Sequence, residues 1–296
     1  MIYLILVSLI WAFSFGLIGS QLRGVDSVFV AFARLLLSLL VFLPLWRPRR
    51  LPRGLLWQVL AIGGLQFGVM YLAYIYSYRF LQSHQVAILT IFTPLLVTLL
   101  SDALVRRPMW GFLAGAALAV AGAGVVEYRG IAGQGALLKG LLLVQLANLC
   151  YAAGQVWYRR LRRRQPQLKD REIFAWLYIG AVIVSGALAA ATVDFAAVRL
   201  TWTQAGALVY LGAVASGLCF FLWNVGATRV SSGTLAVANN LKIPLAVAVS
   251  LLVFGEATNV TRLLIGGALI GAGLALNELI TRRRRKAILA IGCEPS

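Results

Sequence analysis

The chain has 296 residues, of which 61% are hydrophobic and 12% charged, and it carries a formal net charge of +18. Soluble globular proteins are about 45–50% apolar and about 25% charged, so this composition excludes a soluble cytosolic domain and indicates an integral membrane protein. Basic residues collect in the cytoplasmic loops of membrane proteins, which explains the positive charge without nucleic acid as a partner.

Ten apolar runs are long enough to cross the hydrocarbon core of a bilayer, which is ~30 Å thick and needs about 20 residues of helix. Lipid cannot satisfy backbone amides, so each run is predicted to be helical and the fold to be all-α. The first run lacks the basic lead and cleavage site of a signal peptide, and we expect it to be retained. The predicted spans are 2–20, 28–46, 55–77, 83–101, 109–127, 136–157, 172–192, 204–224, 232–254 and 261–281.

The distribution of basic residues predicts the orientation. With the N-terminus in the cytoplasm, 19 of the 27 Lys and Arg residues fall in cytoplasmic connections and 6 in outer ones. This bias follows the positive-inside rule and predicts that both termini are cytoplasmic, in a bacterial inner membrane. The two remaining basic residues, Arg34 and Lys242, lie inside predicted helices.

The two halves of the chain resemble each other at an offset of 150 residues, which aligns Arg79 with Arg229 and Pro94 with Pro244. A repeat of five helices is odd-numbered, so the second copy must enter the membrane in the opposite direction. Such inverted repeats are typical of secondary transporters, which bind substrate near the bilayer midplane between the repeats. The predicted units are two inverted five-helix repeats, 1–135 and 136–286, and a cytoplasmic tail at 287–296.

Three short segments carry a family resemblance: LIWAFSF at 9–15, FARLLLSLL at 32–40 and LLVFGE at 251–256. With the five-plus-five architecture, they make the chain similar to the drug/metabolite transporter superfamily, in its ten-helix EamA-type branch. The resemblance implies transport of small metabolites, often amino-acid export, through a cavity lined mainly by helices 1, 3, 4, 6, 8 and 9. One departure is that Val105 and Arg106 stand where the first repeat would repeat the terminal Gly-Glu.

Lys242 is the central candidate for a binding residue. It lies about ten residues into the ninth span, ~15 Å deep at 1.5 Å per residue, where a charge costs at least ~2.5–3.5 kcal/mol. No acid is expected at that depth, so a substrate carboxylate is the natural complement, with the amides of Asn239 and Asn240 completing a polar pocket. The alternative is a structural lysine that burial keeps neutral or that bonds to carbonyls freed by Pro244.

Polar and aromatic residues at helical spacing predict further lining positions. Residues three and four apart share one face of a helix, and a polar face is expected to point away from lipid. For the aromatic residues, the alternative is the belt at the membrane interface. The additional candidates are Trp11, Ser14, Tyr71, Tyr74, Gln145, Asn148, Tyr151, Gln155, Trp223 and Asn224.

Four residues have roles that the sequence leaves open. His84 is a candidate binding residue, although a lone histidine is more often structural. Pro94 and Pro244 each deprive a carbonyl of its donor and are predicted hinges, or else static kinks. Arg34 is expected to be structural, paired with a carbonyl or with an outer acid such as Asp194.

We therefore expect a secondary transporter that exports amino acids or similar anionic or zwitterionic metabolites by alternating access. One alternative is a cationic-drug exporter, which should require a buried carboxylate. Another is a membrane-embedded enzyme acting on lipid. It would need a nucleophile–base pair or metal ligands, which His84 alone does not supply, so no enzyme is expected. We expect no cofactor and no metal, and a monomer unless small-residue motifs such as Gly267 to Gly271 pair copies of the chain.

Overall fold

The computed structural model describes residues 2–45, 51–103, 121, 134–229 and 232–256, together with scattered positions between 259 and 279. For 232–241 it describes the backbone alone. The elements are α1 (Ile2–Gln21), α2 (Ser27–Phe42), η1 (Leu43–Leu45), α3 (Arg53–Gly63), η2 (Gly64–Val69), α4 (Met70–Ser77), α5 (Ser83–Leu89), α6 (Phe92–Ala103), α8 (Gln134–Arg164), α9 (Asp170–Thr192), α10 (Trp202–Val209), η4 (Tyr210–Leu218), α11 (Cys219–Arg229) and α12 (Ser232–Leu252).

The described residues form helices and loops, without a strand, which confirms the all-α class. Six helices among them are long and apolar enough to cross a membrane. They are Ile2–Gln21, Arg53–Ser77, Ser83–Ser101, Gly135–Arg164, Asp170–Thr192 and Trp202–Arg229.

Two predicted spans lie mostly outside the described residues, at 109–127 and 261–281. The count of ten helices, the inverted repeat and its boundaries therefore stay predictions.

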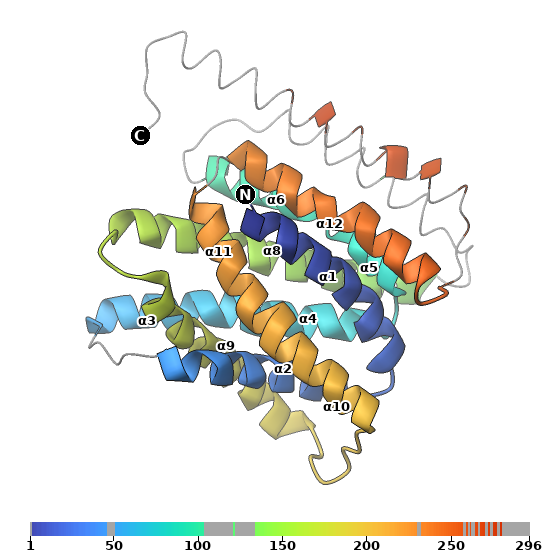
Figure 1. Ribbon diagram of the computed structural model, residues 1–296, viewed down its shortest axis with the longest axis horizontal. Coiled ribbons are helices and arrows are strands. Elements are labelled where there is room, and N and C mark those ends of the chain that lie inside the picture. Colours follow the sequence, from blue (N-terminus) through green and yellow to red (C-terminus); the bar gives the residue numbers. More distant parts are fainter. Residues whose placement is uncertain are drawn as a thin grey trace.

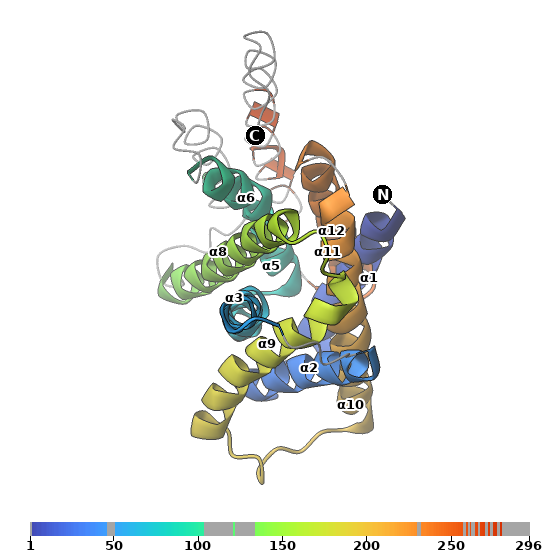
Figure 2. The same ribbon diagram turned by 90° about the vertical axis from the view of Figure 1, so that its left-hand side faces the viewer.

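Helices that are distant in sequence pack side by side, as Figures 1 and 2 show for α1 with α12 and for α2 with α9. A close backbone approach joins α3 to α9. A Cβ atom added at Gly63 would lie 1.9 Å from the carbonyl oxygen of Leu177, and one at Gly180 would lie 2.1 Å from that of Leu60. Glycine at these positions lets the two backbones meet, as small residues do in membrane helix pairs.

Two of the long helices contain a π-helical segment. The segment η2 lies between α3 and α4, and η4 lies between α10 and α11. In η4 the hydroxyl of Ser216 donates to the carbonyl of Leu211, five residues earlier, at 2.7 Å. Such segments are rare and frequently mark functional sites. Ser216 also contacts Arg34, a residue of the candidate site.

The helix predicted at 83–101 is interrupted between α5 and α6. Pro94 has no N–H, so it cannot donate to the carbonyl of Thr90, and the amide of Thr93 donates there instead at 3.0 Å. The carbonyl of Leu89 is then left to side chains on α8. Asn148 donates to it at 2.8 Å and Gln145 at 3.5 Å. Pro244, by contrast, lies inside an unbroken α12.

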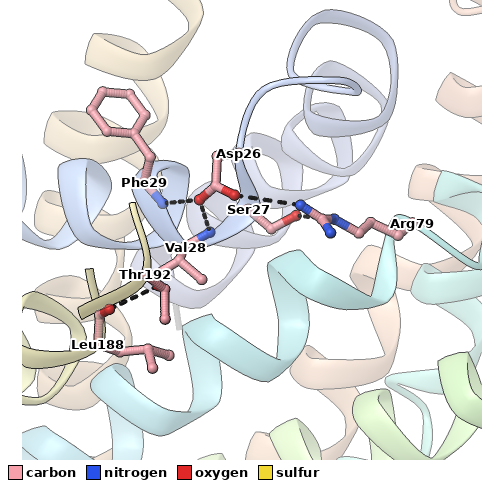
Figure 3. Close-up of polar contacts among 7 residues, drawn as sticks. All are labelled: Asp26, Ser27, Val28, Phe29, Arg79, Leu188 and Thr192. Atoms are coloured by element: carbon pink, nitrogen blue, oxygen red, sulfur yellow. Dashed lines mark hydrogen bonds and ion pairs between the residues drawn. The ribbon is translucent and has the colours of Figure 1, made fainter. Parts of the chain in front are cut away.

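The loops at one end of the bundle are joined by polar contacts (Figure 3). The carboxylate of Asp26 caps α2 by accepting from the amides of Val28 and Phe29, both at 2.9 Å. Its other oxygen pairs with Arg79 Nη2 at 3.4 Å, and Arg79 Nε donates to Ser27. The start of α2 is thereby tied to the chain segment that follows α4.

Candidate functional site

A cavity lies between the helices. Its empty volume is about 590 Å³, which includes open solvent at its mouth. Its walls come from predicted spans 1, 2, 3, 4, 6, 8 and 9, so span 2 joins those that the family resemblance implies. The lining residues are Trp11, Ser14, Phe15, Ile18, Arg34, Met70, Tyr71, Tyr74, Thr90, Thr93, Ala147, Asn148, Tyr151, Phe220 and Lys242.

Trp11 on α1 forms an aromatic wall of this cavity. Its indole N–H donates to the carbonyl of Ala215 at 2.8 Å, which holds the ring in place. The ring centroids of Phe220 and Trp223 lie 4.8 Å and 5.0 Å from that of Trp11. Trp223 is buried and is not among the lining residues, so it packs against Trp11 without lining the cavity itself.

Two basic side chains line the cavity. The Nζ atom of Lys242 lies 4.9 Å from the ring centroid of Trp11 and 6.0 Å from that of Trp223, within the range of a cation–π interaction. Arg34, on α2, is 2% exposed. No acidic side chain is among the described residues that line the cavity, so the walls favour an anion.

The expected partner of Arg34 is wrong, because the structure pairs it with neither a carbonyl nor Asp194. Its Nε and Nη2 atoms lie 3.3 Å and 3.0 Å from the hydroxyl of Ser216, and Nη2 lies 3.2 Å from that of Tyr71. The sequence signal was present, since an arginine inside an apolar helix is as anomalous as Lys242.

Two amide side chains of α8, those of Gln145 and Asn148, bond to other groups of the protein. Asn148 lines the cavity, and its side chain donates to the Leu89 carbonyl and accepts from the hydroxyl of Thr93 at 3.1 Å. Gln145 bonds to the same carbonyl without lining the cavity. These bonds steady the break between α5 and α6 from the neighbouring helix.

The remaining predicted residues fall in three groups. Tyr71, Tyr74, Tyr151, Trp11 and Ser14 line the cavity together with Lys242. Gln155 and Asn224 are buried but do not line it. The side chains of Asn239 and Asn240 lie outside the described residues.

His84 is not among the residues that line this cavity, and its predicted role in binding stays a prediction. Its Nδ1 atom lies 2.8 Å from Oε2 of Glu256. That carboxylate also accepts from the backbone amides of Ser83 and His84, at 3.0 Å and 3.1 Å. Burial alone would raise the pKa of Glu256, but the hydrogen bonds from His84 and Ser83 outweigh it and lower the pKa to about 2.

Comparisons with known proteins cover nearly the whole chain. The EamA-like transporter family model matches residues 1–128 and 138–279. A probable biotin transporter of Pseudomonas aeruginosa is 42% identical over 288 residues, 96% of this chain and 99% of its own. Biotin transporters of Salmonella typhimurium and Escherichia coli K12 are each 37% identical over 276 residues, 93% of this chain and 91% of theirs.

A solved crystal structure of another protein has the same fold, with a TM-score of 0.66 at 21% identity, covering 95% of this chain and 97% of its own. The expectation of an amino-acid exporter is wrong, because relatives that match this chain almost from end to end are named as biotin transporters.

Proposed function

The chain belongs to the EamA-like transporter family and is an integral membrane transporter, and from this premise we propose that its substrate is biotin, bound in the cavity lined by Trp11, Arg34 and Lys242. The observation that carries the proposal is the identity of 37–42% to proteins named as biotin transporters, over nearly all of both chains.

The chemistry of the cavity supports this substrate. Biotin has an apolar chain that ends in a carboxylate and a neutral fused ring system that carries a ureido group. Arg34 and Lys242 complement the carboxylate, and Trp11 and Phe220 offer apolar surface to the chain and rings. A lipophilic cation would instead meet the positive charge of Arg34 and no carboxylate among the described lining residues, which argues against a cationic-drug exporter.

The transport cycle is proposed to be alternating access, in which two inverted repeats rock about a fixed site. Pro94 and Pro244 are the proposed hinges. The break between α5 and α6 supports this role for Pro94, because a helix interrupted beside the cavity offers a place for the backbone to bend. The bonds from Asn148 and Gln145 would hold the break in the state described here.

Entrance counterflow tests the substrate without assuming a direction of transport. Proteoliposomes containing the purified protein are loaded with unlabelled biotin and diluted into labelled biotin. We expect label to accumulate transiently, and to accumulate in neither protein-free liposomes nor liposomes loaded with an amino acid. Counterflow with an amino acid or a lipophilic cation, but not with biotin, would contradict the proposal.

A further inference from the structure

Arg34 is held in one orientation by neutral groups. Ser216 accepts from its Nε and Nη2 atoms, and Tyr71 lies 3.2 Å from Nη2. Its Cζ atom also lies 4.6 Å from the ring centroid of Tyr71. The guanidinium is therefore positioned by three hydrogen bonds and one aromatic face, none of which carries a negative charge.

One nitrogen of this guanidinium makes no hydrogen bond to the described part of the chain. Its Nη1 atom is buried and has no hydrogen-bond partner among the described residues. Arginine stays protonated in proteins, and a buried charge normally requires pairing because its loss of hydration is costly. Arg34 lines the cavity, so an occupant of the cavity can supply what the chain does not.

We infer that the guanidinium of Arg34 binds the carboxylate of the substrate, an inference that rests on the proposed function and names its anchor. The planar fork of arginine matches a carboxylate in geometry and charge. Its bonds to Ser216 and Tyr71 orient it before the substrate arrives, so little freedom is lost on binding. The substrate is thereby selected as the free acid, and a neutral amide of the same shape is rejected.

Lys242 has a different part in this arrangement. Lys242 lies on α12 with its Nζ atom over the ring of Trp11, whereas Arg34 reaches the cavity from α2. Both charges attract an anion, but a single ammonium has no planar fork. Discrimination between acid and amide therefore depends on Arg34 more than on Lys242.

The test compares biotin with biotinamide, its neutral analogue, by measuring Kd for the purified protein in detergent. We expect the wild type to prefer biotin by roughly 10- to 100-fold, as loss of a charge-assisted bond predicts. Arg34→Gln should reduce this preference to about twofold or less and leave biotinamide affinity close to the wild-type value. Lys242→Gln should keep most of the preference. Arg79→Gln, which removes the half-exposed arginine paired with Asp26, is the matched control and should change neither Kd.

Several results would overturn the inference: an unchanged preference in Arg34→Gln, an equal loss of both ligands in that variant, a preference lost in Lys242→Gln instead, or a wild type that binds both ligands equally. An equal loss of both ligands would indicate that Arg34 only supports η4. A wild type that binds neither ligand would contradict the proposed function itself.

Arg34→Lys is the second variant, to be used if Arg34→Gln does not purify as a single folded species. It retains the positive charge but not the fork, so the preference should fall several-fold while biotinamide affinity stays the same. An unchanged preference in this variant would also overturn the inference.

Discussion

His84 and Glu256 are 172 residues apart in the chain, and their side chains meet at 2.8 Å between Nδ1 and Oε2. An ionised carboxylate only accepts hydrogen bonds, so the histidine ring donates. Together with the bonds from the amides of Ser83 and His84, this contact ties the segment that follows α12 to the start of α5. The glutamate of the terminal Gly-Glu in the family resemblance thus acts as a clasp between the end of α12, the helix that carries Lys242, and the start of α5.

This clasp should make stability depend on pH in the acid range. The pKa of Glu256 is lowered from 4.5 to about 2 in the folded protein. A carboxyl group with a depressed folded-state pKa contributes stability that is fully present above about pH 4.5 and is lost as the pH falls towards 2. Thermal unfolding in detergent between pH 6 and 2 should show this loss for the wild type. Glu256→Gln should be less stable at pH 6 and flatter below pH 4.5, whereas the exposed Asp194→Asn should follow the wild type. Parallel curves for wild type and Glu256→Gln would refute the role of the clasp.

Replacing Asn148 should weaken the junction between α5 and α6. Asn148→Leu keeps the shape of the side chain but removes the donor to the Leu89 carbonyl and the acceptor for Thr93. Leaving a buried polar group unsatisfied costs about 1–3 kcal/mol, so we expect a lower unfolding temperature and slower biotin counterflow. Gln145→Leu removes the longer, 3.5 Å bond to that carbonyl and the acceptor 3.2 Å from Asn148 Nδ2, but it leaves the bonds of Asn148 to Leu89 and Thr93 in place and should have a smaller effect. Equal effects of the two variants would count against this account of the break.

Removing the charge of Lys242 should weaken biotin binding without unfolding the protein. The ammonium lines the cavity and lies over Trp11, so Lys242→Gln lowers the positive potential that an anion meets. A loss of about twofold to threefold in affinity, smaller than that in Arg34→Gln, is expected because a single ammonium attracts the anion without a planar fork. Titration of labelled biotin onto purified protein measures it, with the exposed Lys139→Gln as the matched control. Wild-type affinity in Lys242→Gln would remove this lysine from the site.

Gly63→Ala should disrupt the pairing of α3 with α9. The added methyl group would sit 1.9 Å from the backbone carbonyl of Leu177, and a backbone cannot move aside as a flexible side chain can. Overpacking of this kind costs about 1–3 kcal/mol or more, which should appear as a lower unfolding temperature and a lower yield of folded protein. Gly206→Ala, which has open space around the added group, should be tolerated. A stable Gly63→Ala protein would mean that the two helices are able to separate without cost.

The sequence predicted the membrane class and the places of most described helices because these depend on local properties. An apolar run of sufficient length must form a helix in lipid wherever it lies in the fold. The same reasoning identified Lys242, Tyr71 and Asn148, because a polar or charged residue within such a run demands an explanation. Substrate class was harder: the pattern indicated an anion, but amino-acid export came from the family resemblance, and the named relatives corrected it.

What the sequence determined by itself is therefore which segments enter the membrane and which side chains are anomalous there, since hydration and backbone bonding are settled residue by residue. Tertiary structure decided which of those side chains share a cavity. Arg34 became a lining residue because η4 places Ser216 beside it, and His84 became part of a clasp because the chain after α12 brings Glu256 to it. Contacts across 182 and 172 residues depend on how helices cross, and hydrophobic periodicity carries no information about that.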